Sequence, residues 1–125
     1  MLKYVTLIFG SAALFNMLVG GALFIQGPSL MGAVDVPLPG EVMVVANLAA
    51  VLIFVFGIGY LCVALDPHKN ISLVWLGAVG KTAAIIVVTW PWVTGSLTGP
   101  FPYLVLIDLI YVVLFLGVWR ALKAS

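Results

Sequence analysis

Charge is what this sequence has least of. Only 7% of its 125 residues are charged, five basic and four acidic, whereas 65% are hydrophobic. A soluble domain carries about a quarter charged and about half apolar residues, so this chain cannot cover a water-exposed surface. The composition therefore predicts an integral membrane protein. The formal net charge of +1 also lacks the basic footprint of a nucleic-acid-binding protein, and we expect no nucleic-acid partner.

Cysteine and histidine occur once each, as Cys62 and His68. A single cysteine excludes an internal disulfide and a cysteine-rich metal site. The sequence also contains no spaced set of metal ligands, no nucleotide-binding loop and no serine–histidine–acid motif. We therefore predict no metal site. The sequence identifies no cofactor and no catalytic residue, and it favours a non-enzymatic role over a catalytic one.

Long apolar runs dominate the sequence instead, at about 4–26, 41–65, 71–94 and 101–122. Each reaches the roughly 20 residues that a helix needs to cross a bilayer. Helices are favoured because an open sheet would leave backbone groups unpaired in lipid. The first run exceeds the roughly 7–15 residues of a signal-peptide core, so we expect it to be retained. We predict a single four-helix transmembrane domain over 1–125.

The connections between the runs define how the helices follow one another. A proline-rich loop at 27–40 joins the first two runs, and short connections at 66–70 and 95–100 join the others. Short connections favour antiparallel neighbours, so the predicted fold is all-α, an antiparallel four-transmembrane-helix bundle. Pro67 should end the second helix, and we expect Asn70 or Ser72 to cap the third.

Apart from Lys81 in the third run, the basic residues lie on one side of this arrangement. Lys3, Lys69, Arg120 and Lys123 fall at the two termini and in the 66–70 connection, whereas the other two loops contain no lysine or arginine. Because cytoplasmic loops of membrane proteins are enriched in lysine and arginine, both termini are predicted to be cytoplasmic. We expect a multi-pass protein of a bacterial inner membrane.

Each apolar run contains one strongly polar residue in its interior: Asn16, Asn47, Lys81 and Asp108. The helical rise of about 1.5 Å per residue places all four within a band of about 10 Å in depth. A charge facing lipid is costly, so we expect these side chains to face the bundle interior. Lys81 should pair with Asp108, with the asparagines supplying further hydrogen bonds, and Tyr111 shares the helix face of Asp108.

The role of this polar cluster has several interpretations. A buried Lys81–Asp108 pair can serve only to fix helix register. Alternatively, the cluster binds or transports a ligand, and Gly77 and Gly80 leave room beside Lys81 for a head group or a close helix contact. A third interpretation is a membrane-embedded isomerase-type or redox-associated enzyme in which Asp108 transfers a proton. The chain as a whole can also be a structural or accessory subunit of a larger membrane complex.

A family resemblance supports the fold. The segment GYLCVALDPHKN at 59–70, followed by LGAVGK at 76–81 and the intramembrane Asp108, resembles small bacterial four-helix inner-membrane proteins grouped loosely as DoxX-like. The resemblance implies the same four-helix fold. Some DoxX-type proteins are associated with thiosulfate or quinone redox chemistry, but this chain shows no motif that carries that activity over.

We therefore expect the bundle to bind a lipid-like or quinone-like molecule from the outer side of the membrane. Lys81 would hold an anionic or carbonyl oxygen, and Asp108 would balance its charge. Asn16 and Asn47 would orient the head group, with Tyr111 as a further hydroxyl. Expected partners are membrane lipids, such a small molecule, and other membrane subunits or a second copy of the chain.

Overall fold

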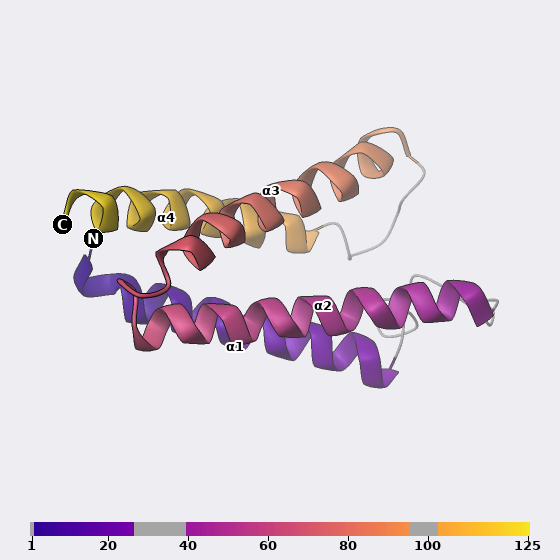
Figure 1. Cartoon of the computed structure of the whole chain (residues 1–125). Coiled ribbons are helices and arrows are strands. Elements are labelled where there is room, and N and C mark those ends of the chain that lie inside the picture. The colour runs from indigo at the N-terminus through magenta and orange to yellow at the C-terminus, as the bar shows by residue number, and fades with distance from the viewer. Residues whose placement is uncertain (1, 27–39, 96–102) are drawn as a thin grey trace.

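The structure, a computed structural model, describes residues 2–26, 40–95 and 103–125 of the chain. A short 3-10 helix, η1 (Leu2–Tyr4), leads into α1 (Val5–Gln26), and α2 (Gly40–Leu65), α3 (Ile71–Val93) and α4 (Leu104–Ala124) follow (Figure 1). Within these described ranges every regular element is helical, which confirms the all-α class. The four α-helices are all long and apolar enough to cross a membrane. The predicted loops at 27–39 and 96–100 lie outside the described residues.

The turn between α2 and α3 corrects one sequence-based expectation. No side chain caps the start of α3, although Asn70 occupies the cap position. The Asn70 side-chain amide instead donates to the carbonyls of Cys62, at 3.0 Å, and Asp66, at 2.9 Å. The last carbonyls of a helix lack partners within the helix, so an amide donor is more useful there. Asn70 therefore closes the end of α2, and the prediction that it or Ser72 caps α3 is wrong.

The helices pack as two pairs, α1 with α2 and α3 with α4, with fewer contacts between the pairs. Figure 1 shows the pairs lying closer together at the end that holds both termini than at the opposite end. Glycine brings α1 and α2 together: a Cβ on Gly20 would lie 2.7 Å from the carbonyl oxygen of Ala50. Small residues permit this close backbone approach in membrane helices.

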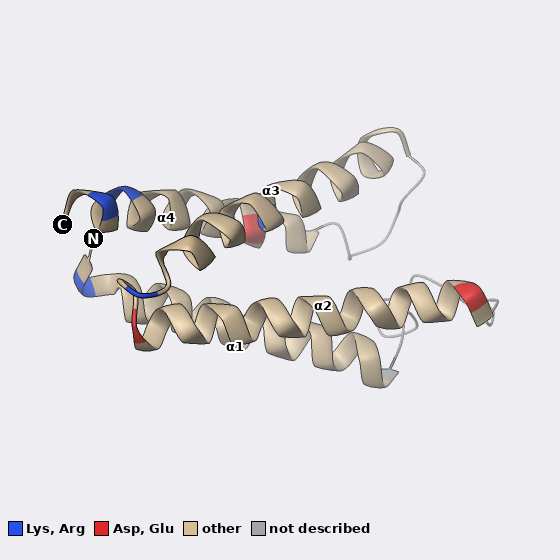
Figure 2. Cartoon of the chain, viewed as in Figure 1, with Lys and Arg blue, Asp and Glu red and all other residues tan. Residues whose placement is uncertain are grey.

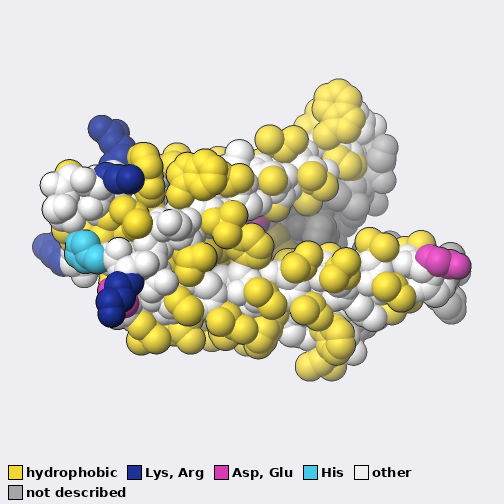
Figure 3. Space-filling model, in the orientation of Figure 1, with side chains coloured by type: hydrophobic (Ala, Val, Ile, Leu, Met, Phe, Trp, Pro, Cys, Tyr) yellow, Lys and Arg dark blue, Asp and Glu magenta, His cyan; other side chains and the backbone are white. Residues whose placement is uncertain are grey.

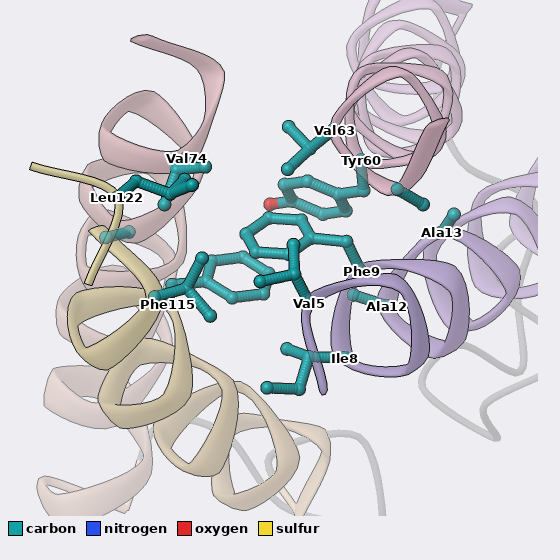
Figure 4. Close-up of a cluster of buried hydrophobic side chains, with 13 residues drawn as sticks. Val5, Ile8, Phe9, Ala12, Ala13, Tyr60, Val63, Val74, Phe115 and Leu122 are labelled. Atoms are coloured by element: carbon teal, nitrogen blue, oxygen red, sulfur yellow. The ribbon is translucent and has the colours of Figure 1, made fainter. Parts of the chain in front are cut away.

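The buried core lies toward the end that holds both termini. The rings of Phe9 and Phe115 stack with centroids 4.2 Å apart, and Tyr60 meets both edge-on (Figure 4). Ten further buried residues complete the core: Val5, Ile8, Ala12, Ala13, Val63, Ala64, Val74, Ala78, Val118 and Leu122. The outer surface is also largely hydrophobic on the face in Figure 3, which suits contact with lipid better than contact with water.

Candidate functional site

The Lys81 ammonium lies at the centre of the molecule, where the side chain is only 5% exposed. It donates to Asp108 Oδ1 at 2.6 Å and to Asn16 Oδ1 at 3.2 Å. Lys81 belongs to α3, Asp108 to α4 and Asn16 to α1. These contacts therefore join three helices through one charged group, and they bring together three of the residues selected from the sequence.

The fourth helix contributes a backbone group rather than a side chain. The Asn16 amide donates through Nδ2 to the carbonyl oxygen of Ile53 in α2, at 3.1 Å. Because its Oδ1 accepts from Lys81, Asn16 uses both ends of its amide. One chain of hydrogen bonds thus runs from α2 through Asn16 and Lys81 to Asp108, and it crosses all four helices.

Asn47 lies apart from this cluster. Its side chain is half-buried, and it makes no hydrogen bond with the described residues Asn16, Lys81 or Asp108. Residues three apart share a helix face, which places Asn47 on the side of Ala50, and Ala50 packs against Gly20 of α1. The expected convergence of all four deep polar residues is therefore not seen for Asn47.

Three aromatic rings surround the ammonium. The ring centroids of Phe15, Tyr60 and Tyr111 lie 5.6, 5.5 and 5.3 Å from Lys81 Nζ. Ring faces attract a cation within about 6 Å, so they stabilise the charge away from water. Neither Phe15 nor Tyr60 was expected at the site, and no pattern in the sequence pointed toward either ring.

Aromatic rings of α2 pack against both Gly77 and Gly80. A Cβ on Gly77 would lie 2.7 Å from Cε1 of Tyr60, and a Cβ on Gly80 would lie 3.0 Å from Cε1 of Phe56. The space that the sequence predicted beside Lys81 is therefore partly filled by side chains of α2. Glycine at position 77 leaves the space that the Tyr60 ring needs to reach the charged group.

Tyr111 takes a different part from the one expected. Its hydroxyl donates to Ser11 Oγ in α1 at 2.9 Å, and not to Asp108. The ring, rather than the hydroxyl, meets the ammonium. Tyr111 is therefore one of the three rings around the Lys81 ammonium, and its hydroxyl also connects α4 with α1.

A cavity of about 290 Å³ adjoins the cluster. This volume is close to the lower limit of about 300 Å³ for small-molecule pockets. Asn16, Lys81 and Asp108 reach it, and the Asp108 side chain remains 17% exposed. The other described lining residues are almost all apolar or aromatic: Phe15, Val19, Leu23, Leu52, Ile53, Phe56, Tyr60, Gly80, Ala84, Val88, Leu104 and Val105.

The polar groups at the cavity retain hydrogen-bonding capacity. Lys81 has three N–H donors, and two of them meet oxygen atoms of described residues. Among the same residues, Asp108 Oδ2 accepts no hydrogen bond. Within residues 2–26, 40–95 and 103–125, no group of three or more histidine, cysteine, aspartate or glutamate side chains could hold a metal ion.

No family model, curated protein or solved structure matches the chain. Over the residues that the structure describes, the fold and the site define a class by themselves: a helical protein with four helices that are apolar enough to span a membrane, and an ion pair between α3 and α4. The resemblance to DoxX-like proteins stays a prediction.

Proposed function

We propose that this chain is a multi-pass membrane protein that binds an amphipathic small molecule in the cavity beside Lys81 and Asp108. The observation that carries the proposal is a cavity of about 290 Å³ that touches three polar side chains within otherwise apolar walls. Ligand pockets combine apolar walls with a few placed polar groups in this way. The walls suit a hydrocarbon chain, and the ion pair suits the polar end of the molecule.

The unused hydrogen-bonding capacity favours binding over a purely structural ion pair. An ion pair that only fixes helix register is most effective when every donor and acceptor is satisfied by the protein. Here the third N–H of Lys81 and Oδ2 of Asp108 have no oxygen or nitrogen partner among the described residues, and both side chains line the cavity. A ligand supplies the hydrogen-bond partners that the described residues do not provide.

The distribution of charge supports an orientation in the membrane. The basic residues Lys3, Lys69, Arg120 and Lys123 belong to η1, the α2–α3 turn and the last turns of α4, and Figure 2 shows basic groups gathered at the end that holds both termini. Under the positive-inside rule, we place this end in the cytoplasm of a bacterial cell and treat the helices as an antiparallel bundle in its inner membrane. The cavity then belongs to the outer half, and its ligand enters from that side.

A matched pair of tryptophan substitutions tests the binding proposal. Ala83 and Ala84 are both exposed, but only Ala84 lines the cavity. Native mass spectrometry of the protein released from its own membrane should detect a bound small molecule on the wild type and on A83W. A84W should lose it, because the indole fills the cavity. An equal amount of bound molecule on A83W and A84W, or none on the wild type, would overturn the proposal.

A further inference from the structure

The charge balance of the cavity narrows the chemistry of its occupant. Among the described residues that line the cavity, Lys81 and Asp108 are the only charged ones, and their Nζ and Oδ1 atoms are 2.6 Å apart. We infer, on the basis of the proposed function, that the occupant is an uncharged lipid whose polar end is a hydroxyl group held between Lys81 and Asp108.

Ionic head groups of either sign fit this site poorly. The Asp108 carboxylate already neutralises the Lys81 ammonium, so a carboxylate or phosphate would bring an uncompensated negative charge next to Asp108. A cationic head group meets the same obstacle from Lys81. Like charges repel strongly where water is scarce, and an interface rejects a ligand that leaves a charge unpaired. The anionic oxygen expected at Lys81 from the sequence therefore does not fit this site.

Among uncharged groups, the hydrogen-bonding pattern selects a hydroxyl. Among the described residues, the third N–H of Lys81 and Oδ2 of Asp108 have no oxygen or nitrogen partner, which leaves one donor and one acceptor at the cavity. A hydroxyl accepts and donates at once, so a single group can satisfy both. A carbonyl or an ether oxygen only accepts, and it would leave the carboxylate oxygen without a partner away from water.

The walls and the volume set the size of the apolar part. Leu23, Leu52, Val88 and Leu104 contribute one apolar side chain from each of the four helices. The cavity volume of about 290 Å³ lies near the lower limit of about 300 Å³ for small-molecule pockets, so the occupant is small. A medium-length alcohol such as decanol matches this space and supplies the required hydroxyl.

A series of ligands with one chain length tests the inference on the full-length protein in maltoside micelles. The probes are decanol, decyl methyl ether, ionised decanoate and protonated decylamine, each at the same mole fraction in the micelle. Binding to the folded state raises the Tm, and the same titration of A84W corrects for effects on the micelle. We expect decanol to bind at least about tenfold more tightly than each of the other three, the size of one lost hydrogen bond to a charged group.

A charge-removing variant gives a second readout. Replacing Asp108 by Asn (D108N) removes the negative charge but keeps the shape of the side chain, so Lys81 is left as an uncompensated cation. The preference should then reverse, with decanoate binding about tenfold more tightly than decanol. The wild-type series does not depend on the folding of this variant.

The outcomes separate this inference from the proposed function. Preference of the wild type for decanoate or decylamine, or equal binding of decanol and its methyl ether, would overturn the hydroxyl assignment and leave a binding cavity. If no probe raises the Tm of the wild type by more than it raises the Tm of A84W, the cavity binds none of these amphiphiles. The proposed function then falls together with the inference.

Discussion

The two halves of this molecule, on either side of Lys81, use the same four helices in different ways. In the half toward the termini, Phe9, Tyr60 and Phe115 from three helices interlock, and each is at most 2% exposed. In the other half the same helices leave a cavity of about 290 Å³. Apolar composition alone therefore does not fill a bundle. The helices pack closely where large aromatic rings lie opposite small residues on neighbouring helices.

The boundary between the halves falls at the charged group. On α1 the core ends at Ala13 and the cavity lining begins at Phe15, and on α3 the change falls between Ala78 and Gly80. The packed half can hold the helices together while the other half stays available to a ligand. The ion pair between Lys81 and Asp108 lies between the two halves, where the core ends, and it forms the polar part of the cavity.

The largest effect is expected where the halves meet. D108L leaves the Lys81 ammonium without its carboxylate and should destabilise the protein by about 3 kcal/mol, since breaking one side of a buried ion pair leaves a charge uncompensated. Unfolding of the protein in maltoside micelles by increasing sodium dodecyl sulfate measures this change. The double variant with K81M as well should be more stable than D108L alone. A double variant that is less stable would show that the cost does not come from the unpaired charge.

Truncation on the two sides of the boundary should give unequal costs. F115A removes a ring that is fully buried, and we expect a loss of about 2–3 kcal/mol. This loss is at or below the lower end of the range for Phe-to-Ala substitutions in water-soluble proteins, because detergent solvates the ring after unfolding. V88A, in the wall of the cavity, should cost less than about 1 kcal/mol, since little packing is lost there. The same unfolding titration compares them, and equal costs would contradict the division into a packed and an open half.

The smallest effect separates two glycines one turn apart. G77A places a methyl group 2.7 Å from the fully buried Tyr60 ring and should cost about 1–2 kcal/mol through overpacking. G80A places it 3.0 Å from Phe56, whose ring borders the cavity and has space to move. Both variants gain the same helix propensity, so the unfolding midpoints should differ in favour of G80A. If G77A were more stable than G80A, the close packing around Gly77 and the open space around Gly80 would both be contradicted.

The spans of the helices could be predicted from the sequence because each apolar run has the length that a helix needs to cross a bilayer. The structure ends α2 at Leu65 and begins α3 at Ile71, on either side of the turn that Pro67 indicated. The contact between Lys81 and Asp108 also followed from the sequence, since Asp108 is the one acid deep in an apolar run. Membrane sidedness and the identity of a ligand stay predictions.

The directions in which side chains point could not be predicted in the same way. Helices that are apolar all round carry no periodic signal for the face that turns inward. For that reason, depth alone suggested Asn47, and nothing in the pattern selected Tyr60 or Phe15. The cavity escaped prediction for a related reason: its volume depends on how rings such as Phe56 fill the space next to Gly80, which is a property of the packed structure.

The order of the hydrogen-bonded residues along the chain has a consequence for biosynthesis. Lys81 precedes Asp108 by 27 residues, whereas Asn16 precedes Lys81 by 65. At about 5–20 residues per second, a ribosome makes Lys81 a few seconds or less before its counter-ion. During that interval the acceptors already synthesised include Asn16 and not Asp108. Asn16 is thus the earliest available hydrogen-bond partner for Lys81 before its carboxylate is made.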